Sequence, residues 1–189
     1  MRKAFLLSTL CCSLSLCGET VAIVNPDFRK DKGGWEFLTM ANEVFELCYE
    51  PAEKFVEVNS TGPDYSGYLA QLVRVKPGTP YRLSVTLRHL KGRGLLWITG
   101  YDKNKQPLAF DQRKYLISSE GNPLVPHFVK KEWMQGSSDT DWRTETLDFT
   151  TETTGKKGGE VHFIRISLGI YFSTARLQFR HVQLQERKK

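Results

Sequence analysis

The sequence has few cysteines that could cross-link it. Its 189 residues contain four, and three of them, Cys11, Cys12 and Cys17, lie close to the N-terminus. Cys48 is the one cysteine in the rest of the chain, so an internal disulfide is excluded there. A chain of this length can bury a sufficient core without disulfides or metals. Because no histidine lies near it in sequence, we interpret Cys48 as a small buried apolar residue rather than a reactive thiol.

The sequence also lacks an apolar run long enough to span a bilayer. A basic MRK, a short apolar run AFLLSTLCCSLSL and a small and polar CGET form the three parts of a secretory signal. We expect residues 1–18 to be a signal peptide, with cleavage after Gly18 or as late as Ala22. Residues 19–189 would then be a single exported domain that is periplasmic, on the cell surface or secreted.

Cys17 leaves a second localisation open, at a membrane surface. A cysteine that closes an apolar stretch is where bacterial lipoproteins are cut and acylated, although the residue before it, Leu16, is larger than such signals favour. Acylation of Cys17 would anchor the protein to a membrane without any membrane span.

Motifs of catalysis and of nucleic-acid binding are absent as well. The four histidines are scattered with no HxH or HExxH spacing, and the GSS at 136–138 lacks a nucleophile-elbow pattern. The net charge is +6, and it falls to +4 (25 basic against 21 acidic residues) once residues 1–18 are removed. No basic stripe with interleaved aromatics accompanies that mild charge. We therefore predict a protein that is not an enzyme and binds no nucleic acid, although two distant carboxylates could still meet across a groove.

What the chain does contain is a series of short β-rich runs separated by turn residues, which predicts an all-β sandwich of two antiparallel sheets. Turn sequences such as KPGTP, KGRG and TTGKKGG supply the breaks. The predicted strands are 20–24, 35–39, 43–48, 54–59, 68–75, 80–90, 94–101, 143–150, 160–171 and 175–185. The segment 103–141 shows little periodicity and is predicted to be one long loop, which we expect to lie over a sheet.

Several of these stretches, taken in order, resemble carbohydrate-binding modules of the family 4, 9 and 22 type, with a galactose-binding-like jelly-roll. They are VNPDF with GGW, AQLVRVKPGTPYRLSVTLR, WITGYDKNKQPL, DWRTETLDFTT, HFIRISLGI and LQFRHVQLQ. The resemblance implies a β-jelly-roll with sugar bound in a groove across its concave sheet. It also implies that Trp35 and Trp142 pack the sandwich.

The chain departs from the family where the family's calcium ligands usually lie. Arg29 stands where the opening motif commonly has a glutamate, and Arg180 and His181 stand in place of a pair of aspartates. Calcium requires several oxygen ligands, and cations remove both the ligands and the favourable charge. We therefore expect no structural calcium, and no other metal or cofactor.

The polar faces of three predicted strands provide the candidate binding residues. They are Arg82, Ser84, Thr86 and Arg88 on one strand, Trp97, Thr99 and Tyr101 on a second, and Arg165, Ser167 and Tyr171 on a third. If these faces lie on one sheet, aromatic rings could cover the apolar side of a sugar while arginines donate to its oxygens. The candidate ligand-binding residues are Arg88, Trp97, Tyr101, Arg165 and Tyr171, with Trp133 from the long loop.

Two hypotheses of function follow. The first is non-catalytic binding of an oligosaccharide or polysaccharide, neutral or anionic, in a concave groove. The alternative is a structural or protein-interaction domain of the cell envelope, with a protein partner and without sugar binding. An open groove at Trp97 and Tyr101 favours the first, whereas a groove filled by Trp133 or Phe128 favours the second.

Overall fold

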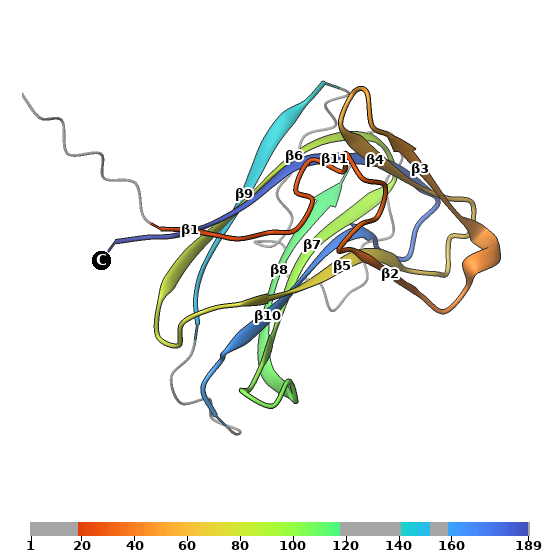
Figure 1. Cartoon of the computed structure of the whole chain (residues 1–189). Helices are drawn as coiled ribbons and strands as arrows, with labels where there is room; N and C mark the ends of the chain where they lie inside the picture. The colour runs from red at the N-terminus through yellow and green to blue at the C-terminus, as the bar shows by residue number, and fades with distance from the viewer. Residues whose placement is uncertain (1–18, 118–140, 152–158, 189) are drawn as a thin grey trace, which may run out of the picture.

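Two antiparallel sheets packed face to face make up the protein (Figure 1). The computed structural model describes residues 19–117, 141–151 and 159–188. Sheet A contains β1 (Thr20–Val21), β3 (Phe45–Glu50), β4 (Phe55–Ser60), β6 (Pro80–Lys91), β9 (Arg143–Thr150) and β11 (Ala175–Glu186). Sheet B contains β2 (Glu36–Thr39), β5 (Gly67–Arg74), β7 (Arg93–Tyr101), β8 (Pro107–Ile117) and β10 (Phe163–Ile170).

The strand order identifies a jelly-roll β-sandwich, which confirms the predicted fold class. Sheet A runs β3-β4-β11-β6-β9 with β1 added on β11, and sheet B runs β2-β5-β10-β7-β8. The 3-10 turn η1 (Asn42–Val44) precedes β3. In the part of the chain that the structure describes, no helix is long and apolar enough to cross a membrane.

The core lies between the sheets and follows the alternation seen in the sequence. Along β6, the side chains at positions 81, 83, 85 and 87 are at most 1% exposed, while those between them point outward. Opposite them, β10 contributes Ile164, Ile166 and Leu168, all fully buried. Trp35 is 4% exposed and packs on Phe28, as expected of a residue that packs the sandwich.

The long loop predicted over 103–141 was wrong in its first part, because β8 occupies Pro107–Ile117 and pairs with β7. Phe110 and Leu116 point into the core, but the inward positions between them are Gln112 and Lys114. These two side chains lie at the edge of the sandwich, where polar groups can reach solvent. Because they are polar, the sequence of β8 does not show the alternation of apolar and polar residues that would predict a strand. The rest of that predicted loop, with Phe128 and Trp133, lies outside the described residues.

Cys48 was also interpreted wrongly, since its side chain is exposed. It lies on the edge strand β3 opposite Glu57, on the side of sheet A that faces away from the core. Glu57 is itself held there by Arg176 and Gln178. The short strand has a polar outer face, and alternation assigns Cys48 to it.

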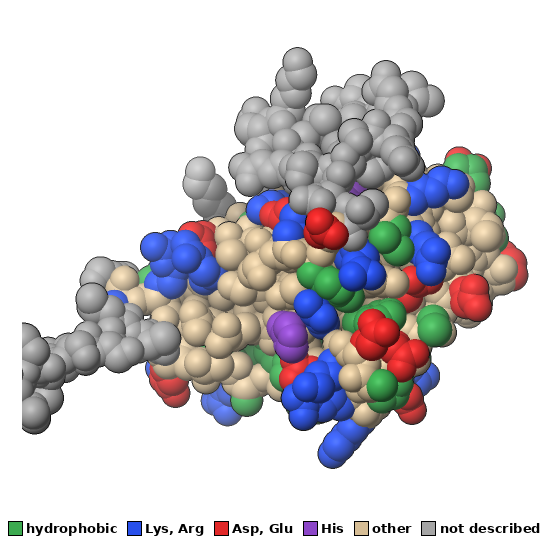
Figure 2. Space-filling view, turned by 90° about the horizontal axis from the view of Figure 1, so that it is seen from above, with side chains coloured by type: hydrophobic (Ala, Val, Ile, Leu, Met, Phe, Trp, Pro, Cys, Tyr) green, Lys and Arg blue, Asp and Glu red, His purple; other side chains and the backbone are tan. Residues whose placement is uncertain are grey.

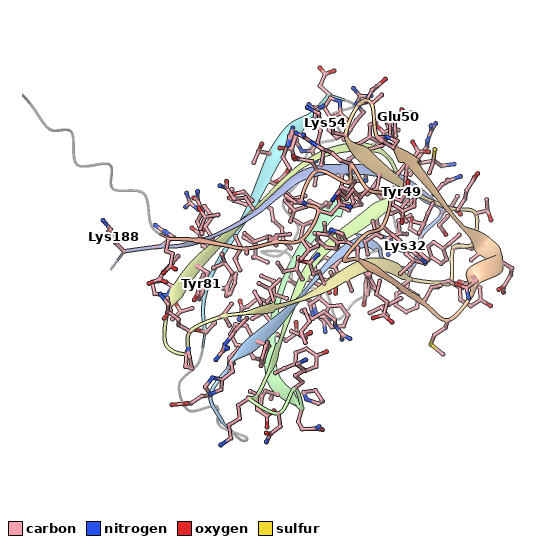
Figure 3. The ribbon with its side chains drawn as sticks, in the orientation of Figure 1. Lys32, Tyr49, Glu50, Lys54, Tyr81 and Lys188 are labelled. Atoms are coloured by element: carbon pink, nitrogen blue, oxygen red, sulfur yellow. The ribbon has the colours of Figure 1, made fainter. Side chains whose placement is uncertain are left out.

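The loop between β1 and β2 contacts both sheets, through β11 of sheet A and Gln71 of β5 in sheet B. Phe28 is fully buried there, and the Val182 amide donates to the Pro26 carbonyl, which ties the loop to β11. The part of the loop that carries Asp31 and Lys32 approaches β3 (Figure 3). Burial there, with the added effect of the Asp31 charge, raises the pKa of Tyr49 to about 12.

At the positions of the family's calcium ligands, the side chains contact one another. The imidazole of His181 contacts the Asp27 carboxylate, and Arg29 lies 3.4 Å from the same carboxylate. The carboxylate of Asp27 therefore faces two basic side chains.

One group of charges joins the open edges of the two sheets. Glu145 of β9 accepts from Lys114 of β8 at 2.8 Å and from Arg143 at 2.7 Å, and all three side chains are less than 20% exposed. Burial tends to raise the pKa of Glu145, but the two cations outweigh it and lower that pKa below its ordinary value. The ionised form of Glu145 is therefore favoured by folding.

We predict that Glu145→Gln lowers the free energy of unfolding by about 1–3 kcal/mol at pH 7, because two partly buried cations lose their carboxylate. A lowered pKa in the folded state stabilises the fold above about pH 4.5, the ordinary value for this group, and that stabilisation is lost as the pH falls through the folded-state pKa. Denaturant unfolding of both proteins at pH 7 and pH 3 should show the difference shrinking at pH 3. An equal difference at both pH values would mean that packing, and not charge, is responsible.

Candidate functional site

The outer face of sheet B carries most of the candidate residues. We call this surface the sheet B face, meaning the side chains of sheet B that point away from the core. Residues that pair across antiparallel strands point to the same side, so each row of pairs is a row on this face. One row runs Glu36, Ala70, Ser167, Trp97 and Arg113 from β2 to β8, and the next runs Leu72, Arg165, Thr99 and Asp111.

Trp97 lies in the middle of this face and is held from two sides. Its indole nitrogen donates to Asp111 at 2.8 Å, and the guanidinium of Arg113 stacks 4.8 Å from its ring centre. The ring of Tyr68 meets it edge-on at 5.8 Å. Towards β10 its cross-strand neighbour is the small side chain of Ser167, which is itself buried.

Arg165 lies next to Trp97 on the neighbouring strand. Its guanidinium stacks 5.4 Å from the ring centre of Tyr101, as the predicted grouping of these two residues requires. The structure thus brings Trp97, Tyr101 and Arg165 onto one face.

Tyr171 belongs to the same face but is mostly covered. It is 7% exposed and packs edge-on against Tyr115 at 5.3 Å, beside the buried Leu95. This small apolar cluster supports Tyr68 and Trp97 from below. Tyr171 therefore packs behind Tyr68 and Trp97 and has little exposed surface of its own.

A cavity of about 570 Å³ opens beside Trp97 on this face. Aromatic and apolar side chains make up most of its wall, and it lies between the end of β2, the loop before β5 and the residue after Tyr171. Its lining residues are Phe37, Leu38, Thr39, Met40, Asp64, Tyr65, Ser66, Tyr68, Trp97, Arg165 and Phe172. Burial raises the pKa of Tyr68 to about 12, so its hydroxyl stays protonated at neutral pH.

The apolar wall of this cavity is open to solvent. Among the described residues, the large apolar side chains counted as exposed are Val24, Met40, Tyr65, Leu72 and Phe172. Three of them line the cavity, and Leu72 lies on the same sheet face. The exposed apolar side chains of the described residues are therefore concentrated around this cavity.

Phe172 has a backbone conformation that its side chain disfavours. Its φ is +41°, and it is 43% exposed at the rim of the cavity. Its amide donates to Ser66 at 3.1 Å, and its carbonyl accepts from Arg93, so the loop is held from both sides. Strain of this kind persists where the surroundings impose it, and it often accompanies function.

Sequence reasoning missed several residues of this wall. Met40, Tyr65 and Phe172 lie in connections between strands, where no alternation indicates a direction. Tyr68 begins a predicted strand, and its outward position could have been read from the buried Leu69 beside it.

The predicted grouping of Arg88 with Trp97 and Arg165 was wrong. The strand that carries Arg88 is β6, which lies in sheet A, so Arg82, Ser84, Thr86 and Arg88 are on the opposite side of the sandwich. Alternation assigns a side chain to one side of its own strand, but it does not say to which sheet that strand belongs.

On that opposite side the polar side chains contact each other. Arg82 makes two hydrogen bonds of 2.7 Å to Asp148, and Thr86 bonds Thr144 at 3.0 Å. Seen from above, where sheet A lies, basic and acidic side chains are interspersed (Figure 2). This arrangement is that of a solvated surface with mutual pairing.

Trp142 does not lie in the core, contrary to the expectation that it packs the sandwich. It is half-buried on the outer side of sheet A, with Arg180 at 3.9 Å and Arg88 at 4.7 Å from its ring centre. It resembles Trp97 in being a half-buried tryptophan under an arginine, but it lies on the other sheet.

The remaining candidate, Trp133, lies outside the described residues. Among the residues that are described, no group of three histidine, cysteine or acidic side chains is placed to hold a metal ion. The cavity beside Trp97 can therefore be described as an aromatic and apolar site with one basic and one acidic side chain.

No protein-family model and no curated protein matches this sequence. Solved structures do match in fold. The enzymatically active domain of tailspike protein 4 from bacteriophage CBA120 aligns with 88% of this chain at 9% identity and a TM-score of 0.63, although the alignment covers 21% of the tailspike chain.

Two smaller proteins align over nearly their whole length. A CBM4 module aligns with 91% of this chain and 97% of its own at 12% identity, with a TM-score of 0.52. A Stig cyclase from Fischerella sp. TAU, solved with an indole compound, aligns with 90% of this chain and 98% of its own at 14% identity, with a TM-score of 0.53. At identities this low, the alignments show that the chain shares the fold of these proteins.

Proposed function

We propose that this protein binds carbohydrate without catalysis, on the sheet B face. The observation that carries the proposal is the open cavity of about 570 Å³ beside Trp97, with aromatic rings in its wall and the guanidinium of Arg165 at its edge. A sugar ring has an apolar side that packs on aromatic faces and hydroxyl groups that need polar partners. Trp97, Tyr68 and Phe172 provide rings, while Arg165 and Ser66 provide polar groups.

The aromatic side chains that would contact a sugar are held in place by their neighbours, which supports sugar recognition. Trp97 is fixed by Asp111 and Arg113, and the ring of Tyr68 is fixed by its contact with Trp97. Side chains that are already ordered lose little conformational entropy when a ligand binds. A sugar can therefore pack on the rings of Trp97 and Tyr68 without a rearrangement of these side chains.

A non-catalytic role is supported by the composition of the cavity wall. Glycoside hydrolysis ordinarily needs two carboxyl groups across the scissile bond. Among the residues that line the cavity, Asp64 alone carries one. The fold itself decides nothing on this point, since an enzymatically active domain and a cyclase share it with the CBM4 module.

Export fits this role. We infer from the N-terminal signal that the domain works outside the cytoplasm, where polysaccharides are exposed. A signal peptide or a lipid anchor at Cys17 would both bring it there, and mass spectrometry of the mature N-terminus would distinguish them.

We predict that Trp97→Ala weakens retention on a glycan array of neutral and acidic polysaccharides at least tenfold. The loss of the central ring removes the main apolar contact with a sugar. Because Trp97 lies outside the main core, the free energy of unfolding should fall by about 1–2 kcal/mol, less than the ~3–5 kcal/mol of a truncated core aromatic.

Trp142→Ala is the matched control for this experiment. It removes a half-buried tryptophan that also contacts arginine, but on sheet A, and it should leave retention unchanged. If both variants bind as the unmodified protein does, the site is not on the sheet B face. If the unmodified protein binds no glycan, a role in protein interaction becomes the better explanation of the exposed Met40, Tyr65 and Phe172.

The strained backbone at Phe172 gives a second prediction. Phe172→Gly and Phe172→Ala both remove the ring, and both should weaken glycan binding about fivefold or more. The glycine variant relieves the positive φ, whereas the alanine variant keeps it, so glycine should be the more stable of the two by about 1 kcal/mol. Thermal unfolding and array binding of the pair separate the two effects. Unchanged binding in both variants would remove Phe172 from the site.

A further inference from the structure

Among the described residues, Arg165 forms no ion pair with a carboxylate, and it is an arginine that lines the open cavity. Arg88 and Arg180 also form no ion pair with a described residue, but they lie against Trp142 on sheet A, away from this cavity. Arg82, Arg113 and Arg176 each hold a carboxylate at 2.6–2.8 Å. The Nε atom of Arg165 is buried without any hydrogen-bond partner in the described residues. A partly buried cation without a counterion is costly, so its persistence at a cavity suggests that a ligand supplies the charge.

The surroundings hold the Arg165 guanidinium in place without neutralising it. Tyr101 stacks on it, which fixes its plane but adds no negative charge. Thr99 of β7 is the cross-strand neighbour of Arg165. Its hydroxyl is also buried, with no hydrogen-bond partner among the described residues. The Arg165 Nε atom and the Thr99 hydroxyl are both covered, so a ligand in the cavity would meet the outer nitrogens of the Arg165 guanidinium.

Three carboxylates lie near this surface, and none of them forms an ion pair with Arg165 among the described residues. Glu36 is on β2, one row away and two strands across. Asp111 lies in the same row but two strands away, and it already accepts from Arg113 and from the indole of Trp97. Asp64 lines the cavity at its other end, before β5 begins. Arg165 pairs with Leu72, and the four residue steps along β5 from Leu72 back to Tyr68 span about 14 Å.

The cavity thus has a basic end at Arg165 and a mostly apolar end that also carries the exposed carboxylate of Asp64. Trp97 and Tyr68 lie between Arg165 and the exposed rings of Tyr65 and Phe172. A ligand that fills it needs a negative group beside Arg165 and flat apolar faces along the rest. A ligand that extends along these strands over about 14 Å is an oligosaccharide rather than a single sugar ring.

We propose that the sugar recognised here is a hexuronate, whose carboxylate pairs with Arg165 while the rings of the chain pack on Trp97 and Tyr68. This inference rests on the proposed function and narrows its substrate class. A planar carboxylate matches the fork of a guanidinium in two parallel hydrogen bonds, and the pre-oriented side chain makes that pairing selective. Binding should therefore depend on the charge of the sugar and weaken as salt is raised.

The experiment is an array of galacturonate, glucuronate and mannuronate oligosaccharides, each beside its carboxyl methyl ester. The ester removes the negative charge and keeps the sugar, so each pair isolates the carboxylate. We expect the full mature protein to bind at least one hexuronate at least tenfold more tightly than its ester. Arg165→Gln should bring acid and ester to equal affinity, and Arg165→Lys should retain part of the preference.

Arg82→Gln is the matched control, because it removes the same charge from the outer side of sheet A and should keep the preference for the acid. Thermal unfolding checks that every variant is folded. Equal binding of acid and ester by the unmodified protein would overturn the hexuronate assignment and leave carbohydrate binding standing. Binding to no glycan, acidic or neutral, would overturn carbohydrate binding and the hexuronate assignment together.

Discussion

The burial of two apolar sheet faces against each other is the constraint on which the rest of this molecule depends. Side chains such as Leu83 on β6 and Ile166 on β10 are fully buried, and each contributes about 1.5–3 kcal/mol by leaving water. A slip of one residue in any strand would turn its whole apolar set outward. The register is therefore strongly fixed, and so is the direction of every side chain between the buried ones.

The two outer faces that this constraint leaves behind have different chemistry. On sheet A several charged side chains pair with each other, as Arg82 does with Asp148 and Arg176 with Glu57, while Arg88 and Arg180 stack on Trp142. On sheet B, small residues such as Ala70 and Ser167 alternate with the large ring of Trp97. The open cavity on this sheet lies beside the rings of Tyr68, Trp97 and Phe172, whereas Ala70 and Ser167 are themselves buried. The two outer faces therefore differ in how much apolar surface they leave open.

Alternation predicted much of the strand pattern because it is a local property of the chain. It correctly grouped Trp97, Thr99 and Tyr101 on one side of β7, and Arg165 and Ser167 on one side of β10. It failed at β8, where Gln112 and Lys114 point inward at the edge of the sandwich and break the apolar period. It failed in a different way for Arg88, whose outward direction was right but whose strand lies in the other sheet.

The sequence by itself determined the all-β class, most of the strands and the side of each strand that enters the core, because these follow from hydrophobic patterning over a few residues. The tertiary structure alone decided which strands are neighbours, and with that which side chains share a surface. Pairing in sheet B joins residues as distant as Leu72 and Arg165, and the loops bring Tyr65 and Phe172 to the same cavity. Such contacts depend on the packing of the whole sandwich, and no local pattern carries that information.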